Sequence, residues 1–240
     1  MFYILILVSI LGYSLQGTLI VAFSRTIDPL SLAVYRNVSL IFIMLPVLFF
    51  STIQEYSAIV NQLPWVVLTG ISGTTGLAVM FRSVRFLPVG ISSGLIQSSG
   101  VLSSLLLGVV FFGELVSAFQ LLAVIILLAG VTTLSKARNP MPHLDSHTMR
   151  GVILALISGT LIAASFFLMG KLSRETGPAI AGYFLEASIG VCSLLFVLLR
   201  FLVTGRSIEP VPLGTLLKIV LASCPTLLGT GAAAWAVTLG

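Results

Sequence analysis

Eight long apolar runs make up most of the chain, and short polar segments separate them. Each run is about as long as the twenty residues that an α-helix needs to cross a hydrocarbon core of roughly 30 Å. The runs are rich in Gly and Ser and lack the apolar/polar alternation of outer-membrane barrel strands. The pattern predicts an all-α membrane protein with eight transmembrane helices, at Phe2 to Phe23, Pro29 to Phe50, Pro64 to Arg82, Val89 to Phe112, Val116 to Leu134, Arg150 to Gly170, Pro178 to Val203 and Pro212 to Leu239.

The longest polar stretch, residues 135–149, divides five predicted spans from three. When the chain is shifted by 149 residues, Ile4-Leu-Ile-Leu-Val-Ser-Ile aligns with Ile153-Leu-Ala-Leu-Ile-Ser-Gly, and the loop from Ser24 (SRTIDP) aligns with the loop from Ser173 (SRETGP). Matched loops and equal span lengths indicate an internal repeat. We therefore expect a first five-helix repeat at 1–134, a linker at 135–149 and a second repeat at 150–240.

An odd number of helices in each repeat makes the second repeat start on the opposite side of the membrane. Such inverted repeats place a solute site near the bilayer midplane, where the two halves expose it alternately to either side. The second repeat contains three of its five expected helices. We therefore expect a complete form to have ten helices, in about 290 residues if the repeats are equal in length, and the present chain to be truncated at its C-terminus.

Composition supports a membrane protein and limits its partners. Hydrophobic residues are 58% of the chain, charged residues are 8%, and the mean hydropathy is +1.17. About a quarter of the residues in a soluble domain are charged, so this chain cannot cover a water-exposed surface. The net charge of +5 is spread over the loops, which argues against a nucleic-acid partner and for the lipid bilayer. We expect a multi-pass protein of the plasma or inner membrane.

Several short motifs resemble the EamA type of the drug/metabolite transporter superfamily. They are Asp28-Pro29-Leu30 followed by Arg36, Leu87-Pro88 before a Ser/Gln-containing span, and Gly113-Glu114-Leu115 followed by Leu122 and Ala129-Gly130-Val131. The resemblance implies ten helices in two five-helix repeats, no cofactor, and the export or uptake of small metabolites, amino acids, sugars or drugs. The chain departs from the family pattern where Gly12-Tyr13 replaces a common Trp-Gly pair.

Two charged residues within spans are the main candidates for solute contacts. Arg36 lies seven residues after Pro29 and Glu186 lies eight after Pro178, which places them about 10 and 12 Å along their helices. Charges at this depth are costly and are functional candidates by default. They either form a buried pair near the pseudo-twofold axis or bind the carboxylate and ammonium of a zwitterionic solute. The alternative is that Arg36 reaches the interface and Glu186 accepts bonds from Ser or backbone groups.

Uncharged polar residues supply further candidates. Gln97 lies in the serine-rich fourth span, and Tyr13 and Gln16 are three residues apart on one face of the first span. These groups either line a cavity or support close helix packing. Pro225 removes a hydrogen bond within the last span and predicts a kink there.

These features of the sequence predict a carrier of a small-molecule solute. We expect no enzyme and no metal site, because both aspartates and both histidines lie outside the spans and no catalytic constellation forms within them. The alternative is an inactive or accessory membrane subunit derived from a transporter, and a homo-oligomer is left open. Most Lys and Arg residues lie on one side, which favours an external N-terminus. The family resemblance implies an internal one.

Overall fold

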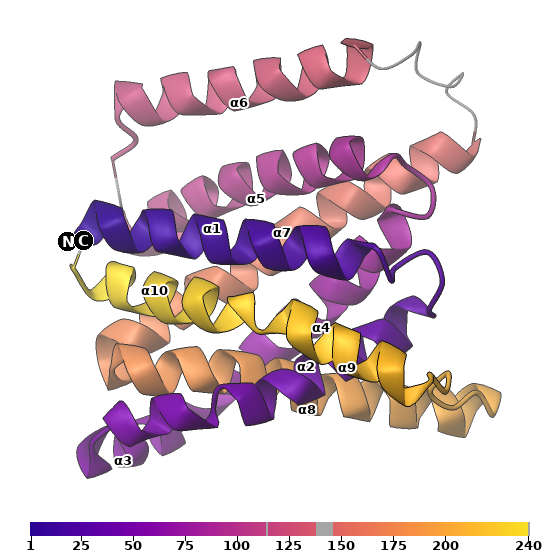
Figure 1. Ribbon diagram of the computed structural model, residues 1–240. Helices are drawn as coiled ribbons and strands as arrows, with labels where there is room; N and C mark the ends of the chain where they lie inside the picture. The colour runs from indigo at the N-terminus through magenta and orange to yellow at the C-terminus, as the bar shows by residue number, and fades with distance from the viewer. Residues whose placement is uncertain (114, 138–145, 240) are drawn as a thin grey trace. The chain divides into compact units, whose positions relative to one another are not determined.

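The computed structural model describes residues 1–113, 115–137 and 146–239, and all of its regular elements in these ranges are helices (Figure 1). The predicted all-α class is therefore confirmed. In chain order the elements are α1 (Phe2–Val21), α2 (Pro29–Ile43), the 3₁₀ helix η1 (Leu45–Phe50), α3 (Ile53–Asn61), α4 (Leu63–Ser83), α5 (Val89–Phe112), α6 (Ala118–Ala137), α7 (Ser146–Thr176), α8 (Pro178–Thr204), α9 (Leu213–Ser223) and α10 (Pro225–Leu239).

Seven candidate membrane spans are present among the described residues. They correspond to seven of the eight predicted runs, with α2 and η1 forming one span and α9 and α10 another. The remaining run, Val116 to Leu134, forms most of α6. Its apolar helical stretch is Ala118–Leu127, which is shorter than a membrane span. The multi-pass architecture is confirmed, and the count of eight stays a prediction.

Proline sets two of the helix boundaries. Pro46 lacks an N–H and its ring clashes with the carbonyl four residues earlier, so α2 ends at Ile43 and the span continues as η1. Pro225 acts in the same way between α9 and α10, where the N–H of Cys224 turns to the carbonyl of Leu221 at 3.2 Å. The kink predicted at Pro225 is therefore present as a break between two helices.

The short helix α3 was not predicted. It begins with a capping box, in which Thr52 N–H donates to Glu55 Oε2 at 2.6 Å and Glu55 N–H donates to Thr52 Oγ1 at 3.4 Å. These reciprocal bonds satisfy helix-end donors that would otherwise need water. Because the helix has only 9 residues, its apolar pattern is too short to be recognised as a span.

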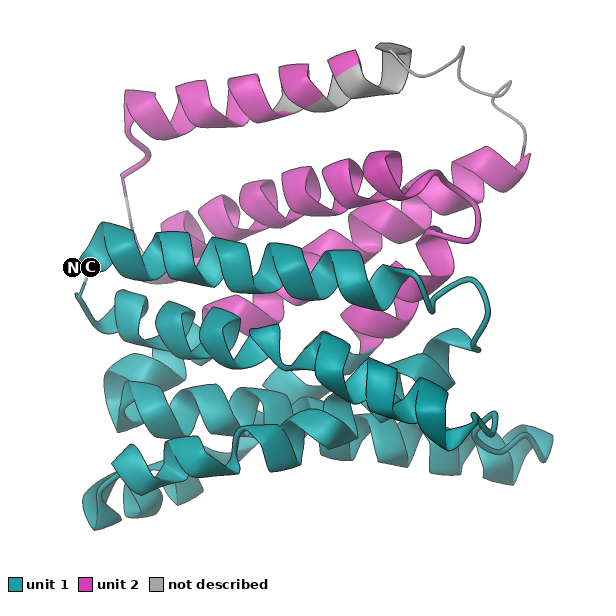
Figure 2. Cartoon of the chain, in the orientation of Figure 1, with its two compact units in different colours: residues 1–74, 168–240 teal, residues 75–167 magenta. Residues whose placement is uncertain are grey.

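The chain divides into two compact units (Figure 2). One contains residues 1–74 and 168–240, and the other contains residues 75–167. In the first unit, α1 packs on α10 and α2 packs on α8. In the second, Leu87, Ile96 and Ala155 form a buried apolar cluster.

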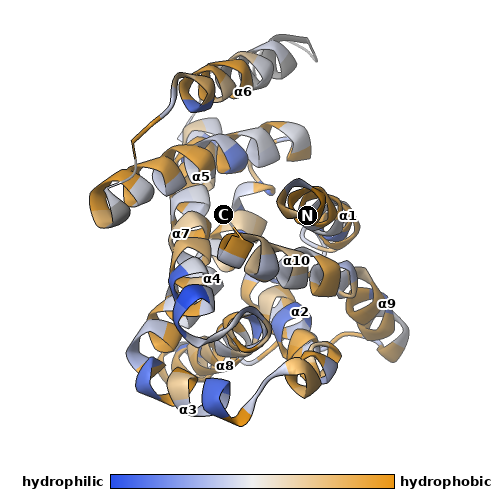
Figure 3. Ribbon diagram, turned by 90° about the vertical axis from the view of Figure 1, so that its left-hand side faces the viewer, coloured by the Kyte–Doolittle hydropathy of each residue, from blue (hydrophilic) through white to orange (hydrophobic). Residues whose placement is uncertain are grey.

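Polar and apolar side chains are arranged as expected for a protein surrounded by lipid. Leu7, Leu11 and Leu15 of α1 are exposed, whereas Gln16 on the same helix is buried. Colouring by hydropathy shows that hydrophobic residues dominate most helices, including those at the surface (Figure 3). Exposed leucines combined with buried polar groups are the reverse of a water-soluble pattern, and they mark the buried polar residues as candidates for function.

Candidate solute-binding site

Arg36 and Glu186 meet in the interior of the first unit. Arg36 Nη1 lies 3.6 Å from Glu186 Oε2, and the two residues are 4% and 2% exposed. One of the alternatives required the Arg36 side chain to reach the membrane interface, and its burial shows that it does not. The two charges form a buried ion contact inside spans that carry almost no other charge.

The antiparallel packing of α2 against α8 brings the pair together. Asn37 bonds to Ser193 and Asp28 bonds to Arg200, so residue numbers rise along one helix as they fall along the other. The helices approach closely at Gly190, where a Cβ atom would lie 3.0 Å from the carbonyl oxygen of Asn37. A larger residue at Gly190 would separate the two helices.

A hydrogen-bonded chain extends from Glu186 to α1. Thr230 Oγ1 of α10 donates to Glu186 Oε1 at 2.7 Å, and Tyr13 Oη lies 2.6 Å from the same Thr230 oxygen. A threonine hydroxyl has one proton, and that proton is given to Glu186. Tyr13 must therefore be the donor to Thr230, which fixes the orientation of both hydroxyl groups.

A second chain extends from Arg36 in the opposite direction. Arg36 Nη1 donates to Asn37 Oδ1 at 2.5 Å, and Asn37 Nδ2 donates to Ser193 Oγ at 2.9 Å. Ser193 donates in turn to the carbonyl of Ile189 at 2.7 Å, which also accepts from Thr74 at 2.8 Å. These bonds leave the Asn37 amide only one orientation and hold the guanidinium in place.

Three buried polar atoms in this region make no hydrogen bond with the described residues. They are Arg36 Nε, Glu186 Oε2 and Gln16 Nε2. The 3.6 Å contact between Arg36 and Glu186 is too long for a hydrogen bond. An unpaired buried group costs about 1–3 kcal/mol, and more when it is charged. The Arg36–Glu186 pair therefore offers one unused donor and one unused acceptor to a ligand, and Gln16 has a further unused donor one helical turn from Tyr13.

The other predicted site residues lie in different environments. Gln16 is buried one helical turn along α1 from Tyr13, on the same face. Gln97 belongs to the other unit, on α5, and its side chain is exposed. The α5 serines Ser92 and Ser99 bond to Ser83 and to the carbonyl of Ile96, as expected for groups that support packing. Glu114 and the linker residues 138–145 lie outside the described part of the chain.

Sequence reasoning missed Thr230, Asn37 and Ser193. Asn37 had a usable signal, because an amide inside a span is costly and the same argument selected Gln97. Thr230 and Ser193 had none, since threonine and serine hydroxyls commonly bond to their own helix in a span. Thr230 and Ser193 differ from other hydroxyl residues in the spans only because Thr230 contacts Glu186 and Ser193 contacts Asn37.

A model of the EamA-like transporter family matches residues 1–136, which is more than half of the chain. The chain belongs to the EamA-like transporter family. It is accordingly a multi-pass membrane transporter of the drug/metabolite type, as its motifs implied, and the family is one of transporters rather than enzymes. Among curated proteins, the comparison found no match. In this EamA-like chain Tyr13, Gln16 and Arg36 lie inside the matched residues. Glu186 of α8 contacts Arg36 directly and is linked to Tyr13 through Thr230.

Thr230→Val should destabilise this EamA-like protein by about 1–3 kcal/mol, because it removes the buried hydroxyl that bonds to both the Tyr13 hydroxyl and Glu186 Oε1. Thr226→Val is the matched control. Thr226 is also fully buried on α10, but its hydroxyl has no hydrogen-bond partner among the described residues. We expect the control to be neutral or stabilising in detergent-based thermal unfolding. Equal losses in the two variants would contradict the bonding scheme.

Proposed function

We propose that this EamA-like protein carries a small polar metabolite or drug-like solute across the membrane by alternating access. The observation that carries the proposal is the buried Arg36–Glu186 contact with its unused hydrogen-bonding atoms. A buried ion pair stabilises a protein most when every one of its donors and acceptors is hydrogen-bonded. A pair left partly unsatisfied in the membrane interior suits a ligand that completes it.

The positions of the two charges support a pair of inverted repeats. Arg36 is seven residues into α2 and Glu186 is eight residues into α8, and each helix begins with proline. Because α2 and α8 are antiparallel, they begin at opposite ends of the helix pair, and each carries its charge at a similar distance from its own start. We propose that 1–134 and 150–240 are the repeats, joined by the linker 135–149, and that they move relative to one another during transport.

The chemistry of the unused atoms limits the solute. Arg36 Nε and Gln16 Nε2 require an acceptor, and a carboxylate suits a guanidinium best. Glu186 Oε2 requires a donor, and an ammonium or a hydroxyl group meets that need. A solute with both groups, such as a zwitterion, fits the cluster of Arg36, Glu186, Tyr13 and Gln16. Gln97 stays a predicted contact from the other unit.

The test is a solute-dependent shift in the thermal unfolding of the purified chain, with amino acids, sugars, nucleosides and cationic drugs as probes. A ligand at a hundred times its Kd stabilises the folded state by about 2.7 kcal/mol. We expect one class to raise the unfolding temperature of the wild type and of Arg206→Ala, an exposed loop control. The shift should be lost in Arg36→Ala.

Flux of the responding class into proteoliposomes completes this test. An inactive or accessory subunit would show neither a shift nor flux with any class. A shift that persists in Arg36→Ala would place the solute elsewhere and refute the proposed site.

A further inference from the structure

A cluster of polar residues joins the start of α2 to the end of α8 and the loop that follows it. Arg200 Nη1 donates to Asp28 Oδ2 at 2.7 Å, and Arg200 Nη2 donates to the carbonyl of Ser207 at 2.7 Å. Burial raises the pKa of the Asp28 carboxyl, but its bonds from Arg200 and Ser31 outweigh this effect and hold the pKa below its usual range. The carboxylate is therefore ionised and paired.

Glu209 adds three further bonds between the same elements. Its carboxylate accepts from the N–H of Asp28 at 2.6 Å, its own N–H donates to Ser31 Oγ at 3.0 Å, and its carbonyl accepts from the Tyr35 hydroxyl at 2.6 Å. Two sequence segments more than 170 residues apart are thus bonded through both side chains and backbone. We call the group Asp28, Arg200 and Glu209 the clasp.

The clasp lies at one end of the helix pair that holds the candidate site. Arg36 is eight residues after Asp28 along α2, or about 12 Å at 1.5 Å per residue. Beyond the clasp, α2 and α8 are joined again next to Arg36 by the bond from Asn37 to Ser193. Any route to Arg36 between these helices from that membrane side passes the clasp.

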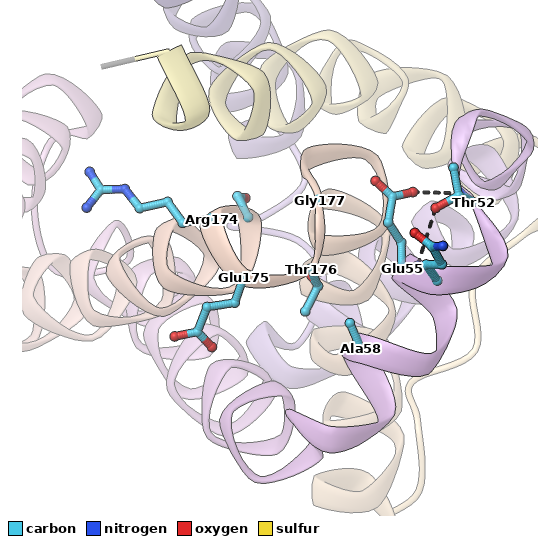
Figure 4. A pocket seen from close by; sticks show the side chains of 9 residues that line it. Thr52, Glu55, Ala58, Arg174, Glu175, Thr176 and Gly177 are labelled. Carbon is cyan, nitrogen blue, oxygen red and sulfur yellow. Dashed lines mark hydrogen bonds between the residues drawn. The ribbon is translucent and has the colours of Figure 1, made fainter.

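The opposite end of the pair, where α8 begins, is arranged differently. A pocket of about 390 Å³ is lined by Thr52, which caps α3, by Glu55 and Ala58 of α3, and by the α7–α8 junction at 173–177 (Figure 4). Among the described residues, the hydrogen bonds of Glu55 are with Thr52 of its own segment. At this end α8 begins without a side-chain cap, at Gly177 with φ +108°. One end of the helix pair is therefore joined by an ion pair and hydrogen bonds, whereas at the other end α8 packs on α3 through Ile59, Ile180 and Ala181, beside the pocket.

We propose that the clasp is a gate that closes one side of the transport route in this structure and releases during the transport cycle. The proposal rests on the alternating-access function above. The charged groups of the clasp are only partly buried, because the side chain of Asp28 is 35% exposed and that of Arg200 is 21% exposed. Water can replace their bonds when the helices separate, so the clasp opens reversibly. Water cannot reach the buried pair of Arg36 and Glu186 in the same way.

The test measures water access to the site without any solute. In a Cys192→Ala/Cys224→Ala background, Gln16→Cys provides one buried thiol next to the candidate site. Its reaction rate with a membrane-impermeant thiol reagent, added to each side of proteoliposomes in turn, reports opening. We expect Arg200→Gln and Asp28→Asn each to raise this rate about tenfold from one side only. The double variant should exceed neither single variant, because both break the same contact.

Lys171→Gln is the matched control. It removes an ion pair of similar length, Lys171 Nζ to Glu175 Oε1 at 2.6 Å, whose two partners both lie on α7. The Lys171 ammonium also lies 5.0 Å from the Trp65 ring of α4, so neither of these contacts joins α2 to α8. The labelling rate should not change in this variant. Equal rates in the control, the wild type and the clasp variants would overturn the gate. Since no solute is used, this result is independent of whether any solute is carried.

A cross-link gives a second measurement if the clasp variants fold poorly. Ser31→Cys with Glu209→Cys replaces a direct contact, the 3.0 Å bond from Glu209 N to Ser31 Oγ, by an oxidisable pair. Oxidation should lower the labelling rate of the Gln16→Cys thiol. In a second protein that carries the same cysteine pair but keeps Gln16, oxidation should stop solute flux, and dithiothreitol should restore both quantities. Unchanged labelling and flux after complete oxidation would show that this end does not open during transport.

Discussion

Glu186→Gln should destabilise the protein by about 3–5 kcal/mol and reduce solute flux at least tenfold, while the protein still inserts into the membrane. The reason is that the change leaves the Arg36 guanidinium as an uncompensated buried charge. Insertion is retained because the long apolar spans determine it. Thermal unfolding in detergent and flux in proteoliposomes measure the two effects separately. Arg36→Ala should act in the same direction.

The double variant Arg36→Gln/Glu186→Gln separates stability from function. With both charges removed, the double variant should recover most of the lost stability, since replacing a buried ion pair by neutral groups is often close to neutral. Its flux should stay low if the charges bind the solute. Additive losses of stability would show that the two side chains do not act as a pair, and normal flux in the single variants would remove them from the site.

Gly12→Ala should destabilise the protein by about 1–3 kcal/mol, and we expect the upper part of this range. A Cβ atom at Gly12 would lie 2.6 Å from the backbone nitrogen of Gly229 and 2.8 Å from the carbonyl oxygen of Pro225. Backbone atoms cannot move aside as a flexible side chain does, so α1 must separate from α10. The bond between Tyr13 and Thr230 would lengthen as a result, and the solute-dependent thermal shift should fall.

Gly17→Ala is the control for this effect, because it makes the same change on the same helix. Among the described residues, no atom outside the adjacent backbone of α1 lies within 4 Å of a Cβ built at Gly17. Replacing Gly by Ala inside a helix stabilises it by about 0.5–1 kcal/mol when space permits. The two variants should therefore shift the unfolding temperature in opposite directions. A similar shift in both would mean that the α1–α10 contact is not as close as described.

The spans were predictable because the bilayer imposes a length and a composition on each of them. The helix η1 and the break at Pro225 illustrate what the same pattern leaves open. Both follow from a proline without an N–H, but only Pro225 was recognised, because Pro46 lies near the end of its span. The capping box of α3 is visible in the sequence as Thr52 and Glu55, yet a helix of 9 residues carries too little periodicity to identify.

The charged members of the site were predictable and their partners were not. Arg36 and Glu186 were found from the cost of a charge in lipid, which needs no knowledge of neighbours. The roles of Thr230 and Asn37 depend on neighbours supplied by other helices. Gln97 satisfied the same sequence criterion and lies in the other unit, so its role stays a prediction.

The sequence by itself determined that this protein is a multi-pass helical membrane transporter, because hydrophobic length, the scarcity of charge and the family motifs are properties of single segments. Only the tertiary structure decided that Arg36 faces Glu186, that Tyr13 donates to Thr230, and that Asp28 is joined to Arg200. These contacts join residues between 150 and 217 positions apart in the chain. Segment composition does not encode which helix faces which, since lipid and protein neighbours favour the same apolar residues, and packing alone selects the partner.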